Sequence, residues 1–238
     1  LWYGATLKCC RAHGAWRCAH GRRVTVMKRR HWLTVALLLP LLAAASPDAL
    51  IKAAESGDVA VLRRLLDAGA NVNARDARGR NAVLAATQGG HVEAARLLIA
   101  RGADVNAQDE IHDSAFLLAG ARGHTEIVRL ALAAGADLKR TNRYGGTASI
   151  PPCHYGHVET VRVLLGSGID VNHINRLGWT ALLEAVILGD GGPRHTEIVR
   201  LLIAHRADVN LADRQGVTPL AHAEQRGQRN IGELLRGA

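Results

Sequence analysis

Apolar residues recur along the chain at the spacing of an α-helix, and short polar stretches that contain glycine separate the apolar segments. One such segment is Thr125–Ala133. Its apolar residues lie at helical rather than strand spacing: Ile127, Val128, Leu130 and Leu132. Gly135 follows, as a glycine commonly does after the last turn of a helix. The pattern therefore predicts short helices.

The same pattern returns every 33 residues. Ala77–Asp109, Glu110–Asn142 and Arg143–Asn175 align without a gap, and each carries a Gly-His-x-Glu step before an apolar run. A relative of Gly-Ala-Asp-Val-Asn follows each run. Such a period indicates stacked units, none of which buries its apolar face alone. The predicted fold class is an all-α repeat solenoid of about six units, which presents a surface rather than an enclosed active-site pocket.

These motifs resemble the ankyrin repeat, and the resemblance covers residues 46–238. It implies units made of a β-hairpin tip, two antiparallel helices and a return loop. Thr147, Thr180 and Thr218 each precede a helix that starts with Ala or Pro, and we predict that they are N-caps. The predicted units, including capping half-repeats, are residues 46–76, 77–109, 110–142, 143–175, 176–213 and 214–238.

The two terminal units and the fifth unit depart from the regular pattern. The first unit is predicted to hold helices at Asp48–Ser56 and Val59–Ala68, with Arg64 on a solvated outer face. The fifth unit contains an insertion, Asp190–Arg194, which we expect to form a loop between its two helices. In the last unit Gly232 replaces a valine of the other units, so the final helix is expected to fray.

The fourth unit departs in its core. Ser149 stands where the other units have Val, Phe or Leu, and Pro152 stands where they have a buried Ala. A proline beyond the first turn of a helix costs about 3 kcal/mol. We therefore expect Pro152, together with Pro151, to distort the first helix of this unit.

A signal peptide is predicted at residues 27–45. Basic residues follow Met27, an apolar stretch spans Trp32–Ala45, and the stretch ends in small residues. It is shorter than the roughly 20 residues of a membrane span, so cleavage after Ala45 is favoured over an uncleaved anchor. Residues 1–26 are predicted to lie upstream of the true start and to be disordered. The predicted location is therefore exported, in the bacterial periplasm.

The net positive charge of the chain comes mainly from residues 1–45, which we call the leader. The whole chain has 30 Lys and Arg against 21 Asp and Glu. Residues 1–45 hold eight basic residues and no acidic one, which leaves 22 basic against 21 acidic residues in the repeats. Nucleic acid is therefore not a predicted partner. Cys153 is the one cysteine outside the leader, so no disulfide framework is predicted.

Candidate catalytic and metal-binding patterns are weak. Cys153-His154-x-x-His157 has the spacing of metal ligands, but the resemblance implies that His157 and the histidines at the same repeat position tie the turn between two helices. The sequence contains neither a Gly-x-Ser-x-Gly elbow nor a phosphate-binding Gly-x-x-x-x-Gly-Lys loop. We predict no enzyme activity, no cofactor and no metal.

The resemblance implies that partners bind to the hairpin tips and to the outward, concave face of the first helices. The candidate partner-binding residues are Arg78, Arg80, Asp113, Arg122, Tyr144, His154, Tyr155, Arg176, Leu177, Trp179, Ile187 and Leu188. Tyr, Trp and Arg are enriched at interface hot spots, and Tyr144, Tyr155 and Trp179 fall together in two adjacent units. The alternative is that Trp179 and Tyr144 stack on neighbouring hairpins and only support the fold.

The predicted function is a monomeric, non-catalytic scaffold that binds a protein partner and, after signal cleavage, no membrane. One alternative is a regulatory or maturation factor for a periplasmic enzyme, since similar bacterial ankyrin proteins have been linked to oxidative stress. The other is a self-association module. A pull-down from the exported fraction would separate a single enzyme partner, a mixture of partners and self-association.

Overall fold

The structure, a computed structural model, describes residues 11–12, 15–16 and 47–238. In the first part, β1 (Arg11–Ala12) pairs antiparallel with β2 (Ala15–Trp16), and Arg11 lies opposite Trp16. The rest of the predicted upstream extension and the predicted signal peptide at 27–45 lie outside the described residues.

Residues 47–238 form twelve helices in six consecutive pairs, which confirms the prediction of an all-α repeat solenoid. The helices are α2 (Pro47–Glu55), α3 (Val59–Asp67), α4 (Ala82–Gly89), α5 (Val92–Ala100), α6 (Ala115–Arg122), α7 (Thr125–Ala133), α8 (Ile150–Tyr155), α9 (Val158–Gly166), α10 (Ala181–Ile187), α11 (Pro193–Ala204), α12 (Pro219–Gln225) and α13 (Arg229–Arg236).

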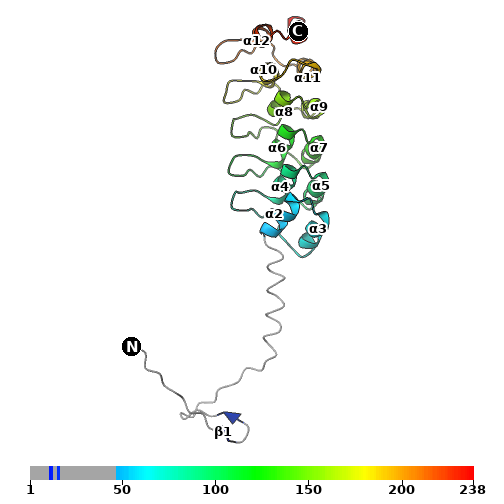
Figure 1. The fold of residues 1–238 in the computed structure, drawn as a ribbon, viewed down its shortest axis with the longest axis vertical. Coiled ribbons are helices and arrows are strands. Elements are labelled where there is room, and N and C mark those ends of the chain that lie inside the picture. The colour runs from blue at the N-terminus through cyan, green and yellow to red at the C-terminus, as the bar shows by residue number, and fades with distance from the viewer. Residues whose placement is uncertain (1–10, 13–14, 17–46) are drawn as a thin grey trace, which may run out of the picture. The chain divides into compact units, whose positions relative to one another are not determined.

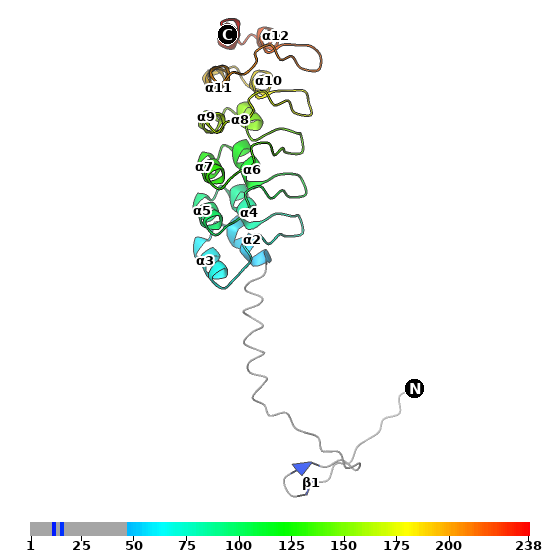
Figure 2. The ribbon, with the colours of Figure 1, turned by 180° about the vertical axis from the view of Figure 1, so that it is seen from behind.

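The pairs stack in two layers. The first helices of the pairs, from α2 to α12, form one layer, and the second helices, from α3 to α13, form the other (Figures 1 and 2). Each helix contacts its pair partner and the corresponding helix of the next unit. The hairpin loops project from the first-helix layer, on the side away from the second helices (Figures 1 and 2). This arrangement leaves hairpins and first helices to share one face.

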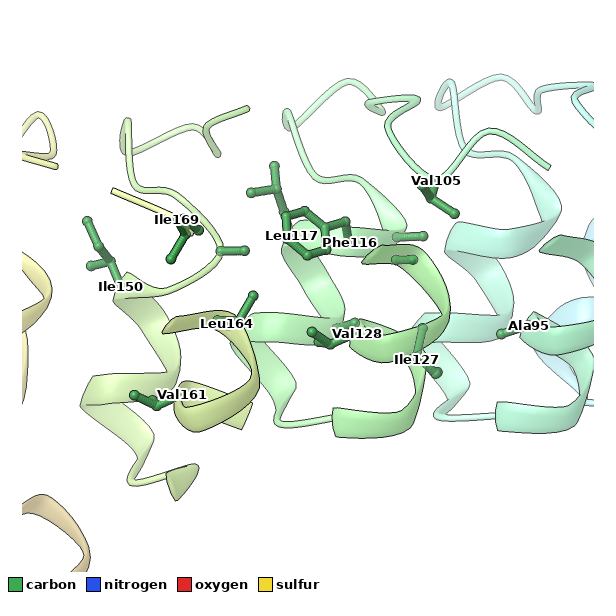
Figure 3. Close-up of a cluster of buried hydrophobic side chains, with 14 of the residues drawn as sticks. Ala95, Val105, Phe116, Leu117, Ile127, Val128, Ile150, Val161, Leu164 and Ile169 are labelled. Carbon is green, nitrogen blue, oxygen red and sulfur yellow. The ribbon is translucent and has the colours of Figure 1, made fainter. Parts of the chain in front are cut away.

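Apolar side chains from both layers form a core that continues through the stack. Phe116, Ile127, Val128, Val161 and Leu164 are fully buried and lie together in Figure 3. Burying one such side chain contributes roughly 1.5–3 kcal/mol. These contacts cross from one unit to the next. An isolated unit would therefore expose these side chains and lose the free energy that their burial contributes.

Most first helices begin at a polar residue whose side chain caps them. Asn81 and Ser114 accept hydrogen bonds from backbone N–H groups three residues later. Thr180 and Thr218 do the same, with distances of 3.2 and 3.3 Å. The N-cap prediction is thus confirmed for Thr180 and Thr218. It is wrong for Thr147, whose hydroxyl instead lies 3.1 Å from the hydroxyl of Ser149.

The prolines of the fourth unit explain this exception. A helix starting at Ala148 would need backbone donors from Pro151 and Pro152, and proline has none. Helix α8 begins instead at Ile150 and spans six residues. Both prolines then fall in its first turn, where an N–H has no partner inside the helix. The expected distortion therefore takes the form of a shortened helix, with Ser149 buried just before it.

The hairpin tips depend on a repeated polar residue and a left-handed turn. At the tip of the third unit, the Asp109 side chain accepts hydrogen bonds from the backbone N–H groups of Ile111 and Asp113, at 3.0 and 2.9 Å. Four tips place a glycine at the left-handed position, with φ between 71° and 86°. The tip of the third unit instead has His112 at the left-handed position, with φ 61°.

We expect His112→Gly to stabilise the protein by about 1 kcal/mol, because left-handed backbone costs roughly 1–2 kcal/mol for a residue with a Cβ. The measurement is the midpoint of urea unfolding. His112→Ala is the matched control, since it removes the imidazole and keeps the Cβ. Equal gains for both variants would show that the imidazole, and not the backbone, is unfavourable.

The insertion of the fifth unit is only partly a loop. Pro193 and Arg194 form the first residues of α11, so the second helix of this unit is extended at its N-terminus. Pro193 occupies the first helical position, which suits a residue with fixed φ and no N–H. The prediction that all of Asp190–Arg194 forms a loop is therefore wrong for its last two residues.

The terminal units are close to prediction. Helices α2 and α3 begin and end within one residue of the predicted bounds, and Arg64 is exposed as expected. Helix α13 continues through Gly232, which is buried. Fraying of this helix stays a prediction.

The return loops are linked by asparagine side chains. Asn106 donates to the carbonyl of Gly135 at 3.2 Å and accepts from the N–H of Asp137 at 2.8 Å. Asn73 and Asn172 make the same pair of bonds to the next unit. Lys139 takes this position in the third unit, and a lysine cannot accept a hydrogen bond. The link between the third and fourth return loops therefore lacks this pair of bonds.

Candidate protein-binding face

Exposed large apolar side chains of the described residues concentrate in the fourth and fifth units. Tyr144, Tyr155 and Leu177 are 53%, 56% and 48% exposed. Tyr144 and Leu177 lie on neighbouring hairpin tips, and Tyr155 is the last residue of α8. The three side chains therefore come from the hairpin and first-helix face.

These side chains surround a cavity of about 280 Å³, which residues of the third, fourth and fifth units line. We call this cavity, with Tyr144, Tyr155 and Leu177 around it, the tyrosine groove. Its lining also includes Asp113, Arg143, Ile150, Pro151, His154 and Glu184. Five residues of the predicted partner-binding set thus line one cavity: Asp113, Tyr144, His154, Tyr155 and Leu177.

Aromatic and charged groups along the groove contact one another. The rings of His154 and Tyr155 stack with centroids 4.2 Å apart. The Arg143 guanidinium carbon lies 4.9 Å from the centre of the Tyr144 ring, within range of a cation–π interaction. Burial, followed by repulsion from His195, lowers the pKa of His154, so its imidazole is neutral at neutral pH. The surface formed by His154 and Tyr155 is therefore aromatic and uncharged, whereas Arg143 carries a positive charge beside Tyr144.

The other predicted residues lie outside the cavity lining. Trp179 and Ile187 are half-buried, whereas Leu188, directly after α10, is 39% exposed. Arg176 is exposed on the fifth tip and donates to the carbonyl of Arg143 at 3.0 Å. Trp179 is therefore less exposed than Tyr144 and Tyr155, and its role in binding stays a prediction.

Three predicted arginine and tip positions belong to other units. Arg80 is half-buried and forms salt bridges with Glu55 at 2.6 Å and Asp76 at 2.8 Å. Arg78 and Arg122 are exposed in the second and third units. These residues share the hairpin and first-helix face with the groove but do not line it.

Sequence reasoning missed Glu184, which lines the groove from α10. It is 9% exposed, and burial raises its pKa to about 7. The signal was present in the sequence, because the corresponding residues of the second and third units are Ala85 and Leu118, both buried. A glutamate at a position that is apolar in sibling units is a candidate functional residue.

Cys153, His91 and His195 make contacts that serve the fold. The Cys153 thiol is fully buried and donates to the carbonyl of Ser149 at 3.1 Å, and burial raises its pKa. His91 and His195 place a ring nitrogen 2.9 and 2.8 Å from a carbonyl oxygen of the preceding unit. Within the described residues, no group of three or more His, Cys, Asp or Glu side chains is arranged to hold a metal ion.

A family model for ankyrin repeats, built on three copies, matches residues 29–109, 110–175 and 153–238. The chain belongs to the ankyrin repeat family. Repeats of this family are generally protein-interaction modules and are generally non-catalytic. Among the helices of the described residues, none combines the length and the hydropathy that a membrane span requires.

Two solved structures of ankyrin repeat proteins are similar to this chain. An ankyrin repeat domain from Acinetobacter baumannii AYE is 51% identical, with a TM-score of 0.77 over 79% of this chain and 96% of that one. The ankyrin repeat protein EF0377 is 38% identical, with a TM-score of 0.77 over 80% of this chain and 98% of that one. No curated protein matches the sequence.

Proposed function

We propose that this ankyrin protein is an exported, non-catalytic scaffold that binds a protein partner through the tyrosine groove and the hairpin tips beside it. The observation that carries the proposal is the gathering of Tyr144, Tyr155 and Leu177, each about half exposed, around one cavity. Exposed apolar side chains that lie next to one another commonly mark an interaction site, whereas single scattered ones are normal on a protein surface.

The scaffold around the groove is suited to rigid docking. The tips of the fourth and fifth units are joined by a backbone hydrogen bond of 2.8 Å from the N–H of Arg176 to the carbonyl of Tyr144. The Asn142 side chain also fixes the fourth tip by accepting from the N–H groups of Tyr144 and Gly146. A surface that is ordered before binding loses less conformational entropy when a partner arrives.

The binding proposal is tested with the double variant Tyr155→Ala, Leu177→Ala in a cross-linking pull-down from the exported fraction. We expect partner affinity to fall at least about thirtyfold, as for the loss of hot-spot side chains. Ile174→Ala is the matched control, because Ile174 is 51% exposed and does not line the groove. Undiminished capture by the double variant would place the binding surface elsewhere.

Export is tested separately. The proposal rests on the basic residues after Met27 and on the apolar stretch that ends at Ala45. We expect intact-mass spectrometry of the protein from the cell envelope to give a mature chain that starts at Ser46. A chain that retains residues 27–45 would contradict cleavage and would favour the membrane-anchored alternative.

A further inference from the structure

The tyrosine groove contains a buried acid that has no partner. The Oε2 atom of Glu184 is buried and forms no hydrogen bond within the described residues. None of the salt bridges within residues 47–238 includes Glu184 or Asp113, the other acid of the groove. A buried carboxylate without a partner is unfavourable, so this position costs the folded protein stability.

The fold does not need an acid at this position. The second and third units place Ala85 and Leu118 there, and both are buried apolar residues. The last unit has His222, whose ring nitrogen lies 2.7 Å from a carboxylate oxygen of Asp213. Glu184 is the one acid at this position of the described repeats, and within them its buried oxygen has no hydrogen-bond partner. Its charge is therefore left to be neutralised from outside the chain.

The charges around the groove favour a cation in it. Asp113 and Glu184 are both lining residues. Arg143, the one basic side chain of the lining that is charged at neutral pH, is exposed and lies over the Tyr144 ring at the edge of the groove. An incoming cation would therefore meet aromatic faces first and a carboxylate deeper in, an order that suits a positive charge on an apolar stem.

The size of the groove favours one side chain over a larger ligand. Its volume of about 280 Å³ is slightly below the range of roughly 300–1,000 Å³ for pockets that enclose a small molecule. It is also open to the face that carries the hairpin tips, where a protein partner would lie in the proposed function.

We propose that the tyrosine groove accepts a lysine or arginine side chain of the protein partner, with the cationic group paired with Glu184 and the apolar stem against Tyr144, Tyr155 and Leu177. The inference rests on the proposed function, and it adds the chemistry of the partner. The partner presents an exposed basic residue on a segment that lies across the fourth and fifth hairpin tips.

The test uses a random-peptide library selected against the full chain. We expect the selected peptides to share one lysine or arginine position. Replacing that residue by norleucine, which keeps an apolar stem and lacks the charge, should weaken binding to the wild type about tenfold or more. The same replacement should have little effect on binding to Glu184→Gln, because the charge then has no carboxylate to meet.

Glu159→Gln is the matched control, since Glu159 is exposed on α9 in the other layer and should leave the norleucine effect unchanged. Peptides that lack a shared basic position, or an equal norleucine effect on wild type and Glu184→Gln, would overturn the inference. In those cases Tyr155→Ala separates the two proposals. If Tyr155→Ala abolishes peptide binding, the groove is the binding site but has no basic anchor. If the peptides bind Tyr155→Ala as well as the wild type, the proposed function fails too.

Discussion

The variant Ser149→Leu, Pro151→Ala, Pro152→Ala is expected to unfold at a temperature roughly 5–10 °C above that of the wild type. The fourth unit lacks three features that its siblings share. Thr147 does not cap the helix, α8 starts at Ile150, and a small polar residue occupies a buried core position. The three substitutions permit a helix that starts at Ala148 in the manner of α4 and α6.

The expected gain has two main sources. Restoring a threonine N-cap contributes about 1 kcal/mol, and burying a leucine in place of Ser149 contributes about 2 kcal/mol. Removing the prolines also returns two backbone donors to the helix. Thermal unfolding followed by circular dichroism gives the temperature, and slower hydrogen exchange at residues 148–153 would show that the added turn has formed.

Pro193→Ala is the control for this prediction. Pro193 is exposed at the first position of α11, where proline is well tolerated. Its replacement should leave the unfolding temperature nearly unchanged. If the triple variant gives no rise, the core around residue 149 has no space for leucine, and the polar contact between Thr147 and Ser149 is the better arrangement.

The third and fourth units together show what the sequence can predict. The 33-residue period and the apolar spacing within Thr125–Ala133 predicted the fold class, and α7 has those same bounds. These features are predictable because the same local pattern is repeated and each copy supports the others. The failed N-cap at Thr147 depends on two prolines several residues later, which move the start of the helix rather than breaking it.

The groove was harder to predict than the helices. Tip residues Tyr144 and Leu177 could be placed on the hairpin and first-helix face from their position in the repeat. The exposure of Trp179 could not, because the packing between adjacent hairpins decides how much of a side chain remains accessible. Glu184 was overlooked because a charged residue on a short first helix normally lies at the surface. Here the neighbouring units cover it.

Glu184→Gln is expected to raise the free energy of unfolding by about 2–3 kcal/mol near pH 8 and by less than about 0.5 kcal/mol near pH 4. Burial raises the pKa of Glu184 from its ordinary value of 4.5 to about 7. At 1.36 kcal/mol for each pKa unit, such a shift corresponds to an upper value of about 3 kcal/mol.

The sign follows from proton binding. Below the unfolded pKa of 4.5 both states hold the proton, so burial of the neutral carboxyl carries no charge penalty. As the pH rises towards 7, the unfolded state releases its proton first and is favoured. Wild-type stability should therefore fall between about pH 4.5 and pH 7 through this group, and the loss is complete above that range. Glutamine does not titrate and should show no such fall.

Urea unfolding of both proteins across this pH range measures the difference. Glu159→Gln is the control, and its difference from the wild type should stay small and nearly constant with pH, since Glu159 is exposed. A Glu184→Gln difference that does not grow with pH would mean that water or a counter-ion already satisfies the carboxylate. A bound peptide with a basic anchor should reverse the order, because only the wild type gains the ion pair. The buried acid is then unfavourable in the free scaffold and stabilising in the complex.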